Sequence, residues 1–235
     1  HDLSIISMPY IILGFFVAGM LILITITKMP NKISESHLSN EFEAFRRLFR
    51  NANYREGVIA QMFYVGAQIM CWTFIIQYAD KLGIPKAQAQ NYNILAMSIF
   101  LTSRFLCTYL MKFVSSKKLL TLFAVGGIIS ISGVIFIHDI RGLYFLIATS
   151  AFMSLMFPTI YGLALHGLGS DTSLGAAGLV MAIVGGALMP PLQGWIVDFE
   201  AVGNYKAVNI SFVLPLICFC VIAAYGYRTL KVHKN

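Results

Sequence analysis

Long apolar stretches recur along this chain, and they constrain its fold more than any other feature. The clearest is Gly57–Ala79, whose residues would rise about 34 Å as an α-helix, enough to cross a hydrocarbon core of about 30 Å. Because a backbone in lipid must satisfy its own hydrogen bonds, each stretch is expected to be a helix. The seven predicted spans are about Met8–Thr27, Gly57–Ala79, Tyr92–Met111, Leu119–Ile137, Leu143–Leu165, Gly175–Val197 and Ala207–Tyr227.

Composition supports a membrane protein. The chain is 58% hydrophobic and 11% charged, whereas about a quarter of a soluble domain is charged. We therefore expect an all-α, polytopic membrane protein. The four cysteines lie inside apolar runs at spacings that do not fit a zinc site, so neither a metal nor another cofactor is expected. The first residues lack the basic region of a cleavable signal peptide, so none is expected there.

Lysine and arginine residues are distributed unevenly between the two sides that these spans would create. If the segment between the first two spans is cytoplasmic, twelve of them fall on the cytoplasmic side and four on the outer side, as the positive-inside rule requires. The net charge of +7 then reflects topology, so no nucleic-acid partner is expected, and the carboxy terminus is predicted to be cytoplasmic. The cytoplasmic set is Lys28, Lys32, Arg46, Arg47, Arg50, Arg55, Lys112, Lys117, Lys118, Arg228, Lys231 and Lys234, and the outer set is Lys81, Lys86, Arg141 and Lys206.

The spacing of the spans divides the chain into four parts. Residues 1–27 form one span, and residues 28–55 form a cytoplasmic linker that is longer than the other connections. Residues 56–228 form a six-span bundle, and residues 229–235 form a cytoplasmic tail. Within the linker, Phe42, Phe45 and Phe49 lie near one face beside basic residues, which is typical of an amphipathic helix on the inner leaflet.

One face of the second span carries polar and aromatic groups. Gln61, Tyr64, Gln68 and Trp72 recur at steps of three and four, so they share a helix face. An unpartnered amide in hydrocarbon costs several kcal/mol, so this face is expected to contact other helices or a watery cavity. Amides suit sugar hydroxyls and an indole suits the apolar face of a pyranose. The alternative is a polar contact between helices.

Arg104 is the one basic residue inside a span. Burying an arginine there costs at least about 2.5 kcal/mol, so we expect it to face protein or water and to be paired. Asn93, Phe100 and Arg104 follow one face of the third span. The predicted partner is a substrate hydroxyl, a backbone carbonyl or a carboxylate outside this chain, and the alternative is a structural arginine bound to helix-end carbonyls.

Helix-breaking residues mark the fifth and sixth spans. Pro158 has no N–H for the carbonyl of Ser154, so a kink is predicted beside Phe157, which would line a cavity. In the sixth span, paired glycines and paired prolines predict either tight packing or a hinge for alternating access. Gln193, just beyond the prolines, is predicted to face an outer vestibule. The predicted hinge residues are Pro158, Gly185, Gly186, Pro190 and Pro191.

Four motifs carry a resemblance to a known family. They lie in Tyr64–Phe74, Ser103–Leu110, Ala151–Ile160 and Asp171–Pro191, and they resemble the fucose:proton symporter family of the major facilitator superfamily, over about Met8–Val221. Gln68 stands where the glucose/galactose branch tends to carry Glu. The resemblance implies that Arg104 belongs to an Arg-Phe pair and that Phe100 lies next to the sugar. Phe157 replaces the family's usual Tyr, which leaves the exact sugar open.

The resemblance implies a carboxy-terminal half that works with a missing amino-terminal half in a bacterial inner membrane. In that family the proton-coupling carboxylates lie in the amino-terminal half, and here all ten acidic residues fall in loops or at span ends. The expected function is proton-coupled transport of a monosaccharide, L-fucose first. The alternatives are an uncoupled sugar facilitator or a symporter for another hexose such as glucose or galactose. No pattern typical of an intramembrane enzyme is present, so an enzyme is not expected.

Overall fold

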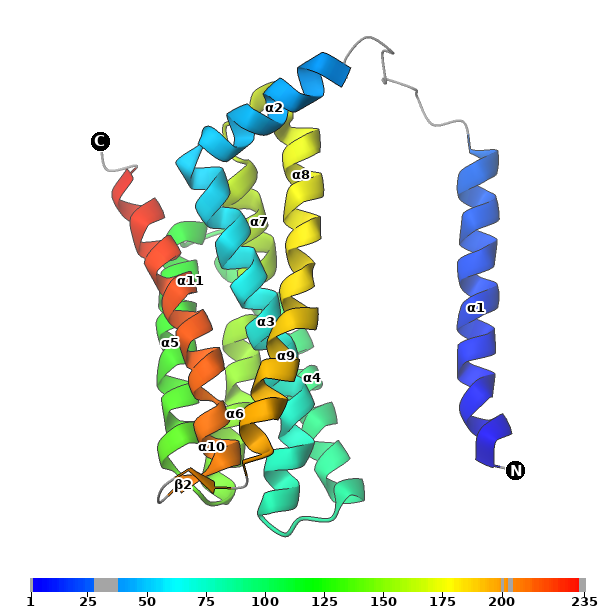
Figure 1. Ribbon diagram of the computed structural model, residues 1–235, viewed down its shortest axis with the longest axis vertical. Helices are drawn as coiled ribbons and strands as arrows, with labels where there is room; N and C mark the ends of the chain where they lie inside the picture. The colour runs from blue at the N-terminus through cyan, green and yellow to red at the C-terminus, as the bar shows by residue number, and fades with distance from the viewer. Residues whose placement is uncertain (1, 28–37, 200, 203–204, 233–235) are drawn as a thin grey trace. The chain divides into compact units, whose positions relative to one another are not determined.

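The computed structural model describes residues 2–27, 38–199, 201–202 and 205–232, and the chain divides into two units, His1–Glu41 and Phe42–Asn235. The first unit contains α1 (Asp2–Ile26), drawn in blue in Figure 1. The predicted stretch Met8–Thr27 is therefore helical almost throughout. Every side chain that is described on α1 is exposed, and its described apolar part, Ile11–Ile26, is shorter than the six spans of the second unit.

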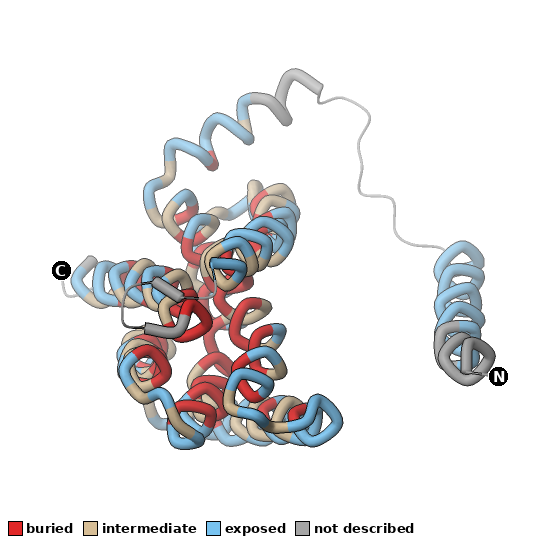
Figure 2. The backbone as a smooth tube through the Cα atoms, turned by 60° about the horizontal axis from the view of Figure 1, so that its bottom comes forward, coloured by how far each residue is buried: buried red, intermediate tan, exposed pale blue. Residues whose placement is uncertain are grey.

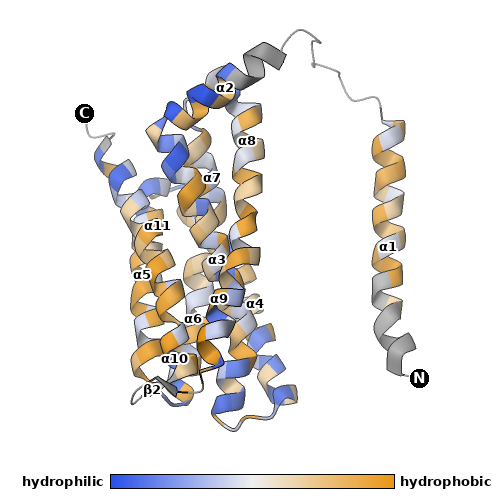
Figure 3. Ribbon diagram, viewed as in Figure 1, coloured by the Kyte–Doolittle hydropathy of each residue, from blue (hydrophilic) through white to orange (hydrophobic). Residues whose placement is uncertain are grey.

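The second unit is a helix bundle, six of whose segments are long and apolar enough to cross a bilayer. Hydrophilic residues gather at its two ends and hydrophobic ones lie between them (Figure 3). These segments confirm the six spans predicted after residue 55. The segments are α3 (Ala52–Lys81), α4 (Lys86–Leu110), α5 (Ser116–Phe136), α6 (Ile140–Met153) with α7 (Met156–Leu165), η1 (Gly169–Asp171) with α8 (Thr172–Met181), η2 (Ala182–Val184) and α9 (Gly185–Val197), and α10 (Ala207–Ser211) with α11 (Val213–Val232).

Polar caps explain why some of these helices begin earlier than their apolar stretches. The side chain of Asn51 accepts a hydrogen bond from the backbone N–H of Tyr54 (3.2 Å), so α3 starts at Ala52 and not at residue 56. At α6, Asp139 accepts bonds from the side chain and the backbone N–H of Arg141. The guanidinium bond is the main reason why the pKa of Asp139 lies below its usual value.

A minor exception to the all-α architecture lies between α9 and α10. Two short strands, β1 (Ala201–Val202) and β2 (Tyr205–Lys206), pair antiparallel there, with Ala201 opposite Lys206. They close the connection between the last two spans and lie far from the residues predicted to bind sugar.

The central helix is α3, and the buried residues gather around it (Figure 2). Small residues let its neighbours approach closely. A Cβ on Gly57 would stand 2.4 Å from the Cβ of Ala164 on α7, and a Cβ on Gly66 would stand 2.6 Å from the Cγ of Met189 on α9. By contrast, α4 is largely exposed: 11% of its apolar stretch of 18 residues is buried inside the unit.

Two spans are interrupted, as the sequence predicted for the fifth. The break between α6 and α7 falls at Ser154 and Leu155, and the hydroxyl of Ser154 donates to the carbonyl of Ala151 (2.7 Å). Pro158, one turn later, has no N–H for the Ser154 carbonyl, which explains the position of the break. The kink prediction is confirmed.

The break in the sixth span lies just before the paired glycines Gly185 and Gly186. The short 3₁₀ helix η2 separates α8 from α9, and Gly185 is the first residue of α9. Pro190 and Pro191 lie inside α9, which continues past them. Whether this segment moves as a hinge remains a prediction.

The linker ends in an amphipathic helix, α2 (Leu38–Arg50), and the linker's residues 28–37 lie outside the described part of the chain. Leu48 is 2% exposed and packs with Tyr54, Ala164 and Leu179. Phe45 and Phe49 are about half exposed, with ring centroids 4.6 Å apart. One apolar side chain therefore holds this part of the linker on the bundle, while two rings stay exposed.

An ion pair adds to this attachment. The guanidinium of Arg47 donates two hydrogen bonds, of 3.0 and 2.9 Å, to the two carboxylate oxygens of Asp171 in η1. The bond to this carboxylate is also the main reason why the pKa of Arg47 lies above its usual value. Fork geometry of this kind is among the stronger forms of ion pair.

We expect Asp171→Asn to loosen α2 without unfolding the bundle. The exposed ion pair is one of the contacts that hold α2 on the bundle, so its loss should make the population of detached helix about fivefold larger. Limited trypsin digestion of the protein in detergent measures this population, because Arg46, Arg47 and Arg50 are cleavage sites. Cleavage in α2 should accelerate about fivefold. Asp198→Asn, at the far end of α9, is the control and should leave the rate unchanged.

Most of the described basic residues gather at one end of the bundle. We call it the basic end; it carries α2, the start of α3 and the end of α11 (Figure 1). The nine basic residues near it are Arg46, Arg47, Arg50, Arg55, Lys112, Lys117, Lys118, Arg228 and Lys231, and the four near the opposite end are Lys81, Lys86, Arg141 and Lys206.

Candidate functional site

The polar face of α3 is divided between the bundle core and a half-buried part. Gln61 and Tyr64 are fully buried, whereas Gln68 and Trp72 are half-buried. The hydroxyl of Tyr64 donates to the carbonyl of Met153 (2.9 Å), the last residue of α6. The helix break leaves this carbonyl without a regular helical donor, so Tyr64 caps a broken helix end. For Tyr64, the structure supports the alternative of a contact between helices.

Trp72 lies where α3, α4 and α6 meet. Its indole N–H donates to the hydroxyl of Ser150 on α6 (3.3 Å). Its ring makes an edge contact with Phe100 on α4, with centroids 5.0 Å apart and planes at 87°. Trp72 and Phe100 are both half-buried, so part of each ring remains exposed. The structure therefore brings together two of the predicted sugar-binding aromatics.

Phe157 belongs to a second aromatic group on α7. Its ring stacks on that of Tyr161, with centroids 6.3 Å apart and planes at 11°. It also makes an edge contact with Tyr64 at 6.1 Å. The break before Pro158 directs these rings toward α3, so Phe157 and Tyr64 lie side by side at the start of α7.

Two predicted site residues carry buried polar atoms that have no hydrogen-bond partner within the described residues. These atoms are both amide atoms of Gln61 and the side-chain oxygen of Asn93. Leaving such a group unpaired costs about 1 to 3 kcal/mol, so an amide in a protein interior normally has a partner. Water or a hydroxylated ligand would supply it. Gln61 is the stronger case because it is 0% exposed.

Arg104 lies on α4, one turn beyond Phe100, and it is exposed. Within the described part of the chain it forms no ion pair. The hydroxyl of Thr108 donates to the backbone carbonyl of Arg104 (2.8 Å), so this hydrogen bond does not involve the guanidinium. The predicted partners that remain are a ligand hydroxyl or a carboxylate of another chain segment.

The structure corrects one prediction and adds buried polar residues that sequence reasoning did not single out. Gln193 does not face a vestibule: it is 0% exposed, and its amide nitrogen donates to the hydroxyl of Ser211 (3.1 Å). Asn209 is 2% exposed and donates to the carbonyl of Val134 (2.8 Å). For both residues the signal in the sequence was a single amide in an apolar run. The direction in which such an amide points depends on how the helices pack.

The described residues contain no group of three His, Cys, Asp or Glu side chains placed to hold a metal ion. The four cysteines are free, and three of them are buried. The polar groups of the candidate site are amides, hydroxyls, an indole and one guanidinium, which are suited to hydrogen bonding with a neutral polar molecule.

No family model matches the chain, but known proteins resemble it in sequence and in structure. It is 60% identical, over its whole length, to the L-fucose-proton symporter of Haemophilus influenzae, of which it covers 55%. It is 34% identical over 94% of its length to the L-fucose-proton symporter of Escherichia coli K12, of which it covers 51%. The chain spans about half the length of the curated relatives it matches.

A solved structure gives the same result for the fold. The crystal structure of FucP, a major facilitator superfamily transporter, in the outward conformation matches 95% of this chain with a TM-score of 0.80 and 32% sequence identity, and the match covers 54% of that chain. These relatives are transporters, in agreement with the expectation that the chain is not an enzyme. The chain is therefore similar in sequence to L-fucose-proton symporters, and its fold matches about half of a major facilitator superfamily transporter.

Proposed function

We propose that this chain is the carboxy-terminal half of a proton-coupled L-fucose symporter that works by alternating access. The cluster of Trp72, Phe100 and Ser150 carries the proposal, because it presents two half-buried rings at the junction of three spans, with the indole held by the buried hydroxyl of Ser150. Relatives named as L-fucose-proton symporters support the choice of substrate. The coupling carboxylates belong to the amino-terminal half, since every acidic residue here lies in a loop or at a span end.

The proposed sugar contacts fall into two groups. Amides and the guanidinium bind the sugar hydroxyls, and aromatic rings pack on the sugar's apolar face. Tyr64 holds the end of α6, just before the break, through its bond to Met153. The kinked α7 and the segment from η2 to α9 are the proposed moving parts, with Pro158, Gly185, Gly186, Pro190 and Pro191 as hinge residues. The proposed sugar contacts are Gln61, Gln68, Trp72, Asn93, Phe100, Arg104 and Phe157, whereas Tyr64 joins helices beside them.

We also propose an orientation in a bacterial inner membrane. The basic end faces the cytoplasm, because nine described basic residues lie there and four lie opposite. The carboxy terminus is then cytoplasmic. In this orientation α2 lies on the inner leaflet: Phe45 and Phe49 enter the interface, while Arg46 and Arg50, on the adjacent face, meet lipid headgroups. The proposed parts are a span (1–27), a linker (28–55), a bundle (56–228) and a tail (229–235).

Uptake of radiolabelled L-fucose by cells that carry the full-length protein tests the function. We expect uptake that requires a proton gradient and that falls at least tenfold in Gln68→Ala and in Arg104→Ala, because each change removes hydrogen bonds to the sugar. Gln77→Ala, an exposed glutamine on α3, and Arg141→Ala, an exposed arginine near the opposite end, are the matched controls. Full uptake in both test variants would remove these residues from the site.

The same assay separates the alternatives. Fucose uptake at the same rate with and without the gradient would identify an uncoupled facilitator. Gradient-driven uptake of glucose or galactose in place of fucose would keep the mechanism and change the substrate. In that case Phe157 is the first residue to exchange, since Phe157→Tyr restores the hydroxyl that is usual in the family.

A further inference from the structure

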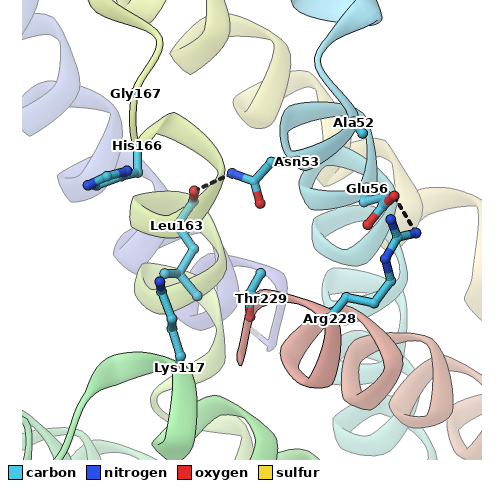
Figure 4. Close-up of a pocket in the computed structure, with 9 residues that line it drawn as sticks. All are labelled: Ala52, Asn53, Glu56, Lys117, Leu163, His166, Gly167, Arg228 and Thr229. Atoms are coloured by element: carbon cyan, nitrogen blue, oxygen red, sulfur yellow. Dashed lines mark hydrogen bonds and ion pairs between the residues drawn. The ribbon is translucent and has the colours of Figure 1, made fainter. Parts of the chain in front are cut away.

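A cavity of about 400 Å³ lies at the basic end of the bundle, among α3, α5, α7 and α11 (Figure 4). Its walls include Asn53 and Glu56 from α3, Lys117 from α5, and Arg228 and Thr229 from α11. Trp72 lies sixteen residues beyond Glu56 on the same helix, about 24 Å along its axis. The cavity is therefore separate from the proposed sugar site, and its volume is in the range of small-molecule pockets.

The charges on its walls leave one cation without a counterion. Arg228 pairs with Glu56 across the cavity edge, at 2.6 Å, as the dashed line in Figure 4 shows. Glu56 is the one carboxylate among the lining residues. Lys117, which is half-buried, forms no ion pair with any residue that the structure describes. The walls thus carry a net positive charge that favours an anion.

The start of α5 adds to this preference. Lys117 lies in the first turn of α5, a helix of 21 residues. The residue before that turn, Ser115, makes no side-chain hydrogen bond to it. The N–H groups of the first turn and the positive end of the helix dipole are then available to an anion beside Lys117.

Next to the cavity, but not among its lining residues, lies a buried hydroxyl that has no partner within the described part of the chain. It belongs to Tyr225, which is 4% exposed and lies one turn before Thr229 on α11. The Tyr225 oxygen lies 3.1 Å from the point where a Cβ on Gly57 would stand, so it occupies space next to Glu56 that the glycine leaves. A buried hydroxyl of this kind normally has a partner. Its position beside Gly57 places it behind the lining of the cavity, so it is not counted among the groups that a ligand would contact.

The remaining polar group is the amide of Asn53. Its nitrogen donates to the carbonyl of Leu163 on α7 (2.9 Å), which fixes the amide across the cavity (Figure 4). Its oxygen is then free to accept a hydrogen bond from a ligand. The cavity thus combines a cation and a helix start with a fixed acceptor.

We propose that this cavity binds a phosphate ester that carries free hydroxyl groups. The phosphate lies against Lys117 and the first turn of α5, and the hydroxyl-bearing part lies against Asn53. Two sources supply this chemistry: a soluble phosphorylated polyol, and the glycerol phosphate headgroup of phosphatidylglycerol in the adjacent leaflet. The site is independent of the sugar site and does not require that the protein transport fucose.

The soluble source is tested with glycerol 3-phosphate as the probe. The full-length protein is placed in phosphatidylcholine nanodiscs, and calorimetric titration measures the dissociation constant. We expect saturable binding that weakens at least tenfold in Lys117→Gln. The control Lys118→Gln removes the same charge from the neighbouring exposed position and should change the dissociation constant less than twofold.

The lipid source is tested in nanodiscs that contain one part phosphatidylglycerol in five, with native mass spectrometry as the readout. If the headgroup is the ligand, glycerol 3-phosphate does not bind in phosphatidylcholine, and one phosphatidylglycerol is retained by the parent and by Lys118→Gln but lost in Lys117→Gln. Ala52→Trp fills the cavity from an exposed position and keeps every charge, so it should abolish binding of either ligand. The proposal fails if neither ligand binds, or if Lys117→Gln and Lys118→Gln weaken binding equally.

Discussion

Gly185→Ala is expected to lower the free energy of unfolding of the bundle by about 3 kcal/mol, since a group forced into close-packed structure displaces what surrounds it. The added Cβ would stand 2.1 Å from the backbone carbonyl oxygen of Met62 on α3 and 2.8 Å from the carbonyl carbon. Backbone atoms cannot rotate out of the way as a long side chain does. The whole of α9 must therefore move away from the central helix.

Gly194→Ala is the matched control, because it lies on the same helix. The nearest atom to its added Cβ is 3.9 Å away, an ordinary contact. Thermal denaturation of the purified full-length protein, followed by size-exclusion chromatography, measures both variants. We expect Gly194→Ala to behave as the parent and Gly185→Ala to denature several degrees earlier. Equal stability of the two variants would contradict the packing that the structure shows between α3 and α9.

This result also bears on the two roles that the sequence predicted for the paired glycines. Tight packing is visible at Gly185 and Gly186, whose added Cβ atoms would stand 2.1 and 3.0 Å from atoms of α3. A hinge at the same place must break this contact during the transport cycle. Gly185→Ala therefore distinguishes the roles: lost transport with normal stability favours the hinge, and lost stability favours packing.

The fold was predictable from the sequence because the bilayer imposes one rule on every span. Apolar runs of about twenty residues gave the number and order of the six spans in the second unit, and Pro158 gave the position of one break. The residues at which the helices start were less predictable. At α3, helix formation continues into a polar turn because Asn51 caps it, and a hydropathy pattern does not register a cap.

The candidate site was predictable only in part, because helical spacing shows which residues share a face but not how deeply the face is buried. Gln61 and Trp72 share a face of α3, yet Gln61 is fully buried and Trp72 is half-buried. Ser150, which accepts the indole N–H, comes from a span 78 residues away. Burial at a given turn depends on how α6, α7 and α9 cross α3, and a single sequence does not contain those crossing angles.

Trp72→Ala is expected to reduce fucose uptake about 100-fold, which is the largest effect expected on transport. The indole joins three helices through Ser150 and Phe100, so its removal takes away the proposed stacking surface and lets Phe100 reorient. A loss of about 2.7 kcal/mol in sugar binding corresponds to this factor. Trp72→Phe keeps a ring and loses the bond to Ser150, so we expect a reduction of about tenfold.

The other tryptophan of the chain provides the control. Trp195 on α9 is 66% exposed and contacts Phe199 at 5.3 Å, away from α3 and α4. Trp195→Ala should therefore leave uptake within twofold of the parent when expression is matched. The binding affinity of detergent-purified protein for L-fucose separates binding from movement: Trp72→Ala should weaken it by a factor similar to the loss of uptake. Normal affinity with lost uptake would instead place Trp72 in the moving parts, because a residue that only transmits motion leaves the equilibrium affinity unchanged.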